Sequence, residues 1–153
     1  MSIHEECGVF GVFTKQPADV SRIVCTGLYA LQHRGQEGCG IVVNDDGTFV
    51  SHKAPGLVSE VFHEQALCAV PLGSMARGHV RYATTGGNGA ANVQPLLANH
   101  QKGRMALAHN GNLANAAKLR DRLELSGAIF HTTSDTEIIA YTALCRYAFH
   151  III

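Results

Sequence analysis

Cys7 stands close to the start of the chain and is followed by the run Gly8-Val9-Phe10-Gly11. The segment Met1–Glu6 in front of it is too short and too charged to be a secretory signal. If that segment were removed, Cys7 would carry a free α-amine beside its own thiol. Such an amine, with an unperturbed pKa of about 7.7–8.0, is suited to take the thiol proton near neutral pH. We therefore predict an N-terminal nucleophile, inactive while Met1–Glu6 is attached.

Cysteine chemistry alone leaves a second interpretation of Cys7 open. Cysteine is among the most frequently buried residues, and Cys7 lies next to an apolar segment that resembles a strand. A small core cysteine is therefore the structural alternative to a nucleophile.

The motif His109-Asn110-Gly111-Asn112 lies where a predicted strand gives way to a helix. The side-chain amide of Asn110 and the backbone N–H of Gly111 could converge on one point and form an oxyanion hole. Asn-Gly is also one of the commonest turn pairs, so a simple turn is the alternative.

Arg81 and Asp135 are candidates to bind an amino acid, which carries one carboxylate and one ammonium group. The planar guanidinium of Arg81 suits a carboxylate, and Asp135 at a helix start could accept from the ammonium. The alternatives are a solvated or ion-paired Arg81 and a helix-capping Asp135. His79 and His33 are interpreted as structural, because the α-amine already supplies the base.

The apolar pattern predicts the elements that must position these residues. A short strand at 8–13 is followed by a helix that Asp19 caps, with an apolar stripe from Val20 to Leu31 and a left-handed C-cap at Gly35. The turn Asn44–Gly47 predicts a hairpin. Further along we expect a short helix at 57–67, strands at 76–83 and 105–108, a glycine-rich loop at 84–89, a helix from 113 to 123, and a last helix opened by the capping box Ser134–Glu137.

Hairpins and intermittent helices favour antiparallel sheets with helices on their outer faces. At 153 residues, with 46% hydrophobic and 16% charged residues, the chain is expected to fold as one domain. The terminal run Ile151-Ile152-Ile153 resembles apolar material that another element should cover, so we expect the chain to be a fragment.

Charge and composition argue against several classes of partner. The formal net charge is zero, which gives no electrostatic case for nucleic acid or an anionic membrane. No apolar run approaches the roughly 20 residues that span a bilayer. The five cysteines form no C-x-x-C pair, and the nine histidines show no ligand spacing, so we expect no metal site and reduced thiols in the cytoplasm.

Six motifs resemble, in order, the glutaminase domain of the amidophosphoribosyltransferase family. They are Cys7–Gly11, Gln32–Glu37, Gly78–Thr84, Asn92–Leu96, His109–Asn112 and Ser134–Glu137. Together they extend over almost everything from Cys7 to about Tyr141. Each is weak by itself, whereas all six in the family's order are specific.

The resemblance implies an α+β fold, a four-layer α-β-β-α sandwich of the N-terminal-nucleophile hydrolase type with two mainly antiparallel sheets, incomplete at the C-terminus. It implies a propeptide at 1–6 and a glutaminase domain at 7–153. In this domain Cys7 would be the nucleophile that forms a thioester with L-glutamine, and Asn110 and Gly111 would be the oxyanion donors. The substrate-binding residues would be Arg81 for the α-carboxylate, Asp135 for the α-amine, Tyr82 and Thr84.

The resemblance also implies parts that these 153 residues do not contain. In the family, ammonia from glutamine passes to phosphoribosylpyrophosphate in a phosphoribosyltransferase domain and gives phosphoribosylamine, the first step of de novo purine biosynthesis. Mg²⁺ is expected in that absent domain, an iron–sulfur cluster is possible there, and no cofactor is expected in this chain. The full-length enzyme is expected to be a cytoplasmic homo-oligomer.

Three alternatives remain at the level of sequence. The chain could be a truncated, catalytically silent fragment. It could be the glutaminase domain of a related amidotransferase, although glucosamine-6-phosphate synthase typically has tryptophan where this chain has Tyr82. A cysteine and histidine metal-binding module is the third.

Overall fold

The computed structural model describes residues 7–82, 89–100 and 103–148. The elements are β1 (Gly8–Ala18), α1 (Val20–Ala30), the 3₁₀ turn η1 (Gln32–Arg34), β2 (Gly38–Asp45), β3 (Thr48–Pro55), α2 (Val58–Val61), α3 (Glu64–Cys68), β4 (Gly73–Arg81), the 3₁₀ turn η2 (Ala90–Asn92), β5 (Leu96–His100), β6 (Gly103–Leu107), α4 (Ala116–Leu125) and α5 (Asp135–Ala148).

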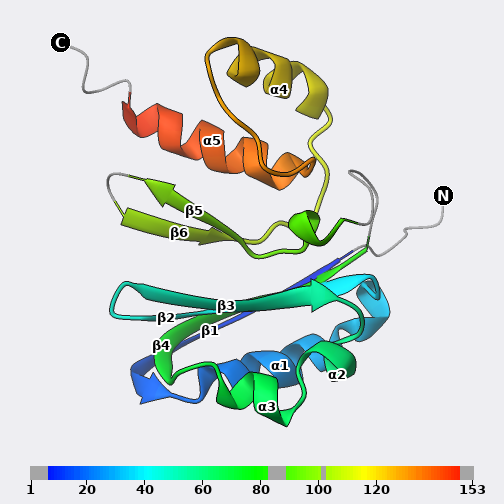
Figure 1. Cartoon of the computed structure of the whole chain (residues 1–153), viewed down its shortest axis with the longest axis vertical. Coiled ribbons are helices and arrows are strands. Elements are labelled where there is room, and N and C mark those ends of the chain that lie inside the picture. Colours follow the sequence, from blue (N-terminus) through cyan, green and yellow to red (C-terminus); the bar gives the residue numbers. More distant parts are fainter. Residues whose placement is uncertain (1–6, 83–88, 101–102, 149–153) are drawn as a thin grey trace.

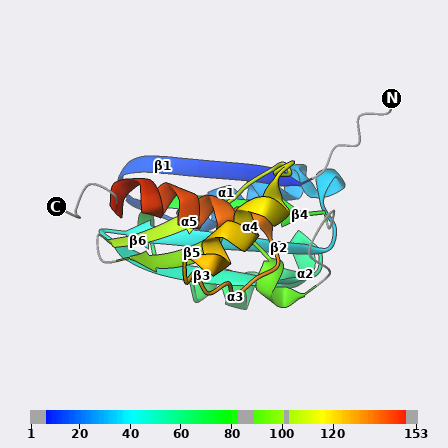
Figure 2. The ribbon, with the colours of Figure 1, turned by 90° about the horizontal axis from the view of Figure 1, so that it is seen from above.

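The strands form two antiparallel sheets with helices on their outer sides. The first sheet has the order β1-β4-β2-β3, and the second is the β5-β6 hairpin. Figure 1 shows the layers: α1, α2 and α3 lie outside the first sheet, and α4 and α5 lie outside the second. Seen from above, α4 and α5 lie over the β5-β6 hairpin (Figure 2). The predicted α+β sandwich with antiparallel sheets is confirmed.

The main core lies between α1 and the first sheet. Val20, Val24 and Leu28 follow one another at the spacing of a helical face, and all three are fully buried. They pack against alternate residues of the strands, among them Ile41 and Val80. Burying each such side chain contributes roughly 1.5–3 kcal/mol, so this layer anchors the first sheet.

The opposite face of the first sheet receives the segment that leads into β5. A Cβ added at Gly40 would lie 2.3 Å from the carbonyl oxygen of Gln94, so only glycine fits there. Nearby, Lys53 Nζ donates to the carbonyl of Val93 over 2.7 Å. Further along, Arg77 Nη1 donates across the two sheets to the carbonyl of Ala106 over 3.1 Å. Two side chains of the first sheet thus bind backbone carbonyls of the second half, where the buried Val93 also packs close to Gly38.

The β2-β3 hairpin turns where the sequence predicts it. Asp46 and Gly47 both have positive φ, 44° and 85°, which two-residue hairpin turns of the I′ type require. Asn44 Oδ1 accepts a hydrogen bond from the N–H of Gly47 over 2.9 Å. The hairpin prediction is confirmed.

Other local predictions differ from the structure. Gly35 has φ of −157°, an extended conformation, so the predicted left-handed cap is wrong. Its small size is needed for another reason, because an added Cβ would lie 2.6 Å from the backbone of Arg81. The predicted helix at 57–67 is two short helices, and the strand β5, which the sequence analysis did not predict, pairs with β6.

The capping box before α5 forms only in part. Ser134 Oγ accepts a hydrogen bond from the N–H of Thr136 over 3.2 Å. The carboxylate of Glu137 accepts instead from the backbone N–H groups of His131 and Thr132. The helix begins as predicted, and Glu137 secures the preceding loop.

Gly40→Ala should destabilise the protein by about 1–3 kcal/mol, because the new methyl group would push the Gln94 backbone off the first sheet. Urea unfolding of both proteins measures the effect. Gly89→Ala is the matched control: Gly89 has φ of −69° and an added Cβ meets nothing within 4 Å. The control should stay within about 1 kcal/mol of the wild type. Equal stability of the two variants would contradict the close packing of the Gln94 backbone on Gly40.

Candidate active site

Cys7 directly precedes β1 and is held by the turn that follows α1. Its φ of 61° lies in a region that residues other than glycine seldom adopt. The N–H of Cys7 donates to the carbonyl of Arg34 over 3.1 Å. In return Arg34 Nε donates to the carbonyl of Cys7 over 2.8 Å. This reciprocal pair fixes the backbone of the predicted nucleophile.

The thiol of Cys7 lies against the end of β4. Its Sγ accepts a hydrogen bond from the backbone N–H of Tyr82 over 3.3 Å. The thiol can also donate to the carbonyl oxygen of Tyr82, 3.5 Å from Sγ, so both backbone groups of Tyr82 hold the sulfur in place. Cys39 shows the contrast: it is fully buried in the core, and burial raises the pKa of its thiol to about 12. Cys7 is only half-buried and stands outside that core, which weighs against the interpretation as a structural cysteine.

Arg81 is the last residue of β4 and is 6% exposed. Its carbonyl accepts a hydrogen bond from the N–H of Glu37 over 3.1 Å, which fixes the backbone at this point. A guanidinium buried to this degree is not the solvated surface side chain of the alternative interpretation. Its backbone lies beside Cys7, because the N–H of the next residue, Tyr82, donates to Sγ.

His79 lies two residues before Arg81 and is fully buried. Burial, with smaller electrostatic contributions from Arg81 and His109, lowers the pKa of His79 to about 4. The backbone of His109 acts to raise the pKa of His79, and this effect is smaller than that of burial. Neither ring nitrogen of His79 has a hydrogen-bond partner of normal geometry among the described residues. His79 is thus neutral near pH 7, which supports the structural interpretation.

Asp135 opens α5 and is 8% exposed. Its Oδ2 accepts a hydrogen bond from the N–H of Leu113 over 2.7 Å. Its Oδ1 lies 3.9 Å from His109 Nδ1, too far for a hydrogen bond. The carboxylate therefore faces the loop that carries Asn110 and Gly111.

The motif 109–112 lies in the loop between β6 and α4, and the helix begins at Ala116, later than predicted. Gly111 has φ of 152°, and a Cβ at this position would lie 2.9 Å from His109 Nε2. Glycine is therefore required for the backbone conformation and for space. Asn110 and Gly111 are both exposed, where a substrate could reach them. A turn and an oxyanion hole both remain compatible with this loop.

These residues gather at one end of the molecule. The start of β1, the end of β4, the end of β6 and the start of α5 lie on the same side in Figure 1. Contacts connect Cys7 to Tyr82 and Asp135 to Leu113. Thr84 and Met1–Glu6 fall outside the described residues, so their predicted roles stay predictions.

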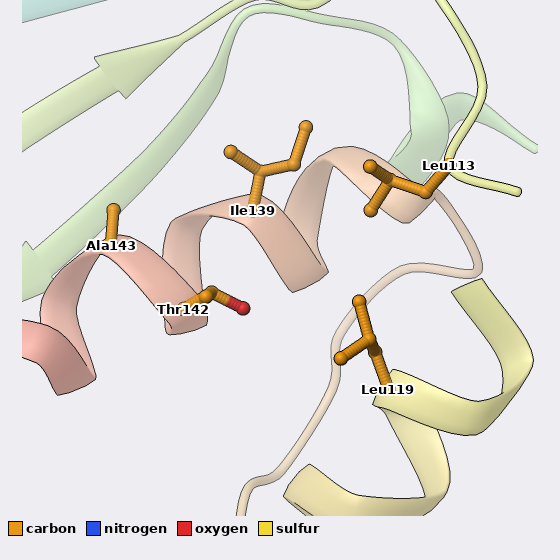
Figure 3. Close-up of a pocket in the computed structure, with 5 residues that line it drawn as sticks. All are labelled: Leu113, Leu119, Ile139, Thr142 and Ala143. Carbon is orange, nitrogen blue, oxygen red and sulfur yellow. The ribbon is translucent and has the colours of Figure 1, made fainter. Parts of the chain in front are cut away.

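An apolar cavity of about 280 Å³ lies elsewhere, between α4 and α5. Figure 3 shows its lining, with Leu119 on α4 and Ile139 on α5. All its lining residues, Leu113, Leu119, Ile139, Thr142 and Ala143, belong to the described part of the chain, and none is charged. A free amino acid needs a cation and an anion, so this cavity is unsuited to bind one.

Two residues that the sequence analysis did not single out take part in the arrangement. Arg34 holds Cys7, and Gln94 bonds to the loop at His109. Both lie within motifs that the sequence analysis quoted as a whole, Gln32–Glu37 and Asn92–Leu96, and no role was assigned to either residue there. No group of three or more His, Cys, Asp or Glu within 7–82, 89–100 and 103–148 is arranged to hold a metal ion. The absence of a metal site in the whole chain stays a prediction.

Comparison with known protein families identifies the family of this chain. The family described as a glutamine amidotransferase domain matches residues 64–148, more than half of the chain. The chain belongs to this family. The resemblance inferred from the six motifs is thereby confirmed at the level of the family.

Two curated relatives of this glutamine amidotransferase domain are amidophosphoribosyltransferases. The amidophosphoribosyltransferase of Bacillus subtilis is 53% identical over 140 residues, which are 91% of this chain and 29% of the relative. The chloroplastic amidophosphoribosyltransferase of Vigna aconitifolia is 50% identical over 137 residues, which are 90% of this chain and 28% of the relative. The chain thus spans less than a third of the length of these relatives.

Solved structures agree with the fold. A structure described as the allosteric regulatory enzyme of purine biosynthesis superimposes with a TM-score of 0.79 and 51% identity, over 87% of this chain and 28% of the other. The Bacillus subtilis glutamine phosphoribosylpyrophosphate amidotransferase complexed with ADP and GMP gives a TM-score of 0.76 and 50% identity, over 86% of this chain and 28% of the other. The predicted N-terminal-nucleophile hydrolase fold is consistent with both.

Lowering the pH should destabilise the domain through His79. Its pKa is about 4 in the folded protein and about 6.5 when unfolded, so the unfolded state binds more protons between these values. Stability from this group is complete above pH 6.5 and is lost as the pH falls toward 4. The loss between pH 7.5 and pH 5 should be about 2 kcal/mol by urea unfolding. An NMR titration midpoint for His79 at or above 6 would contradict this assignment.

Proposed function

We propose that this domain hydrolyses L-glutamine to glutamate and ammonia through a thioester on Cys7. The observation that carries the proposal is the contact of the Cys7 thiol with the backbone of Tyr82, directly beside the buried Arg81. A nucleophile and a fixed cation thus share one corner of the first sheet. Membership in the glutamine amidotransferase family supports the substrate.

Substrate binding uses the two buried charges. Arg81 receives the α-carboxylate of glutamine, since a guanidinium offers two parallel donors. Asp135 receives the α-ammonium group, and its position is set by the N–H of Leu113. Tyr82 and Thr84 complete the substrate-binding residues. Because Arg81 and Asp135 are less than a tenth exposed, water screens their charges little.

The chemical step begins at Cys7 after Met1–Glu6 is removed. The free α-amine takes the thiol proton, and the thiolate attacks the carboxamide carbon of glutamine. Asn110 and Gly111 donate hydrogen bonds to the tetrahedral oxyanion, and the protonated amine returns its proton to the departing ammonia. Water then cleaves the thioester to give glutamate. In the unprocessed chain the Cys7 nitrogen is a peptide N–H bound to the carbonyl of Arg34, and the same carbonyl can hold the freed amine.

The names of the relatives extend the proposal beyond this chain. We propose that the ammonia passes to phosphoribosylpyrophosphate in a separate phosphoribosyltransferase domain, giving phosphoribosylamine at the first step of de novo purine biosynthesis. Mg²⁺ is proposed for that domain, and an iron–sulfur cluster is possible only there. The glutaminase chemistry requires no cofactor from this chain. The complete enzyme is proposed to be a homo-oligomer.

A cytoplasmic location is also proposed. Within the part of the chain that the structure describes, no helix combines the length and the apolar character needed to cross a membrane. Some of the relatives are chloroplastic, so the compartment is a property of each protein rather than of the domain.

Glutamate release by a chain that begins at Cys7 tests the proposed function directly. Asn110→Ala should lower kcat about 100- to 1000-fold, the usual effect of losing one oxyanion donor. Cys7→Ser should show no turnover above background. A loss of less than about tenfold in Asn110→Ala would count against the oxyanion assignment. Absence of glutamate release from the wild type would overturn the proposed function.

Asp135→Asn should raise KM for glutamine about 10- to 100-fold with a smaller change in kcat. The amide oxygen can still accept from Leu113 N–H, but the charge that binds the ammonium is lost. A matched substrate that lacks the α-amino group is the control, and its KM should be the same in both proteins. Equal losses for both substrates would show that Asp135 acts only on the fold.

A further inference from the structure

Gln94 connects the two segments that the proposed chemistry needs to hold together. Its Oε1 accepts a hydrogen bond from the backbone N–H of His109 over 2.7 Å. Its Nε2 donates to Thr136 Oγ1 over 2.9 Å. The first partner directly precedes Asn110, and the second directly follows Asp135. One side-chain amide thus spans the oxyanion loop and the start of α5.

This amide is fully enclosed. Gln94 is 5% exposed and Thr136 is fully buried. In such a place each lost partner leaves a polar group without water, so both bonds are strongly favoured over their rupture. The fork of one acceptor and one donor also fixes the direction of each bond.

The backbone of Gln94 is itself anchored to the first sheet. Its carbonyl oxygen packs so closely against Gly40 that a Cβ added to Gly40 would lie only 2.3 Å from it. The carbonyl of the preceding Val93 accepts from Lys53 Nζ. The first sheet also carries Arg81, so Gln94 relates the oxyanion loop and α5 to the same rigid element.

Asn92 also binds a distant segment through its side-chain amide, but its partner is Thr133. Its Nδ2 donates to Thr133 Oγ1 over 2.9 Å, and its Oδ1 accepts from the N–H of Thr133 over 3.0 Å. Asn92 is 4% exposed, as enclosed as Gln94. This bridge secures the loop before α5, whereas the bridge of Gln94 reaches His109. Asn92 therefore offers a control of matched chemistry and burial.

We propose that Gln94 is a positioning residue that sets the spacing between the oxyanion donors Asn110 and Gly111 and the ammonium-binding Asp135. The inference rests on the proposed glutaminase function and adds a residue to its machinery. Glutamine must present its amide carbonyl to one segment and its ammonium to the other, so their spacing has to match the length of the substrate. Gln94 sets that spacing without touching the substrate.

Gln94→Leu should lower kcat for glutamine hydrolysis about 10- to 100-fold, because displacing catalytic donors by about 1 Å has effects of this size. KM should rise much less than in Asp135→Asn, since the charge of Asp135 remains and the N–H of Leu113 still holds its carboxylate. Gln94→Glu should retain more activity than Gln94→Leu, because a neutral carboxyl group, the form that burial favours, can still accept from His109 N–H and donate to Thr136 Oγ1.

Asn92→Leu is the matched control in the same chain beginning at Cys7. It should lower the free energy of unfolding by an amount similar to Gln94→Leu and keep kcat within about threefold of wild type. Equal losses of kcat in both variants would overturn the proposal, because Gln94 would then act only on stability. Full activity of Gln94→Leu would overturn it as well.

Amide hydrogen exchange at His109 separates this inference from the proposed function. The His109 N–H should be protected in the wild type and in Gln94→Glu, and should exchange at least about tenfold faster in Gln94→Leu. Exchange that does not change would overturn the positioning role whatever the kinetics show. If the wild type releases no glutamate, the glutaminase function fails, whereas the tie between Gln94 and the loop is judged by exchange alone.

Discussion

The antiparallel pairing of β1 with β4 is the constraint on which the site depends. Gly8 pairs with Val80, so the same register carried one residue further places Cys7 opposite Arg81, and the Cys7 thiol accepts from the N–H of the following Tyr82. The register is fixed because Val80 must remain in the core beneath α1. A slip of one residue would turn Val80 away from the core and Arg81 toward it. Apolar packing on one face of β4 thus determines where Cys7 and Arg81 stand relative to each other.

The second half of the site is held by different forces. α4 has no buried residue and contributes little to a core. Hydrogen bonds of side-chain amides and carboxylates hold the loop before α4 and the start of α5. Asp135 accepts from Leu113, and Gln94 bonds to both His109 and Thr136. Buried hydrogen bonds of this kind add directional precision more than stability. They suit a position where two segments must stay at a set spacing.

Much of the first sheet and its covering helix could be predicted from the sequence. The stripe Val20, Val24 and Leu28 follows helical periodicity, and the Asn44–Gly47 turn has its own chemistry. The prediction that Cys7 is a nucleophile followed from its position in the sequence and from the ability of a free α-amine to take the thiol proton. Each of these signals is local, and local signals survive in a single sequence.

The parts that could not be predicted depend on distant partners. Gly35 matches a helix cap by type, yet its actual neighbour is the backbone of Arg81, far along the chain. Gln94 bonds to residues 15 and 42 positions away, and no periodicity marks such a pair. The strand β5 was missed because it has only five residues, directly follows Pro95 and shows no apolar–polar alternation. Only the folded chain shows which distant partners these residues contact.

Intact-mass spectrometry with an electrophilic glutamine analogue such as diazo-oxonorleucine tests the central claim most directly, because it reports on the N-terminus and the nucleophile together. A chain beginning at Cys7 should gain one adduct, located on Cys7, and excess glutamine should slow the labelling. The chain that keeps Met1–Glu6 should remain unlabelled, since a peptide nitrogen cannot take the thiol proton. Equal labelling of both chains, or labelling of another cysteine in preference to Cys7, would contradict the account.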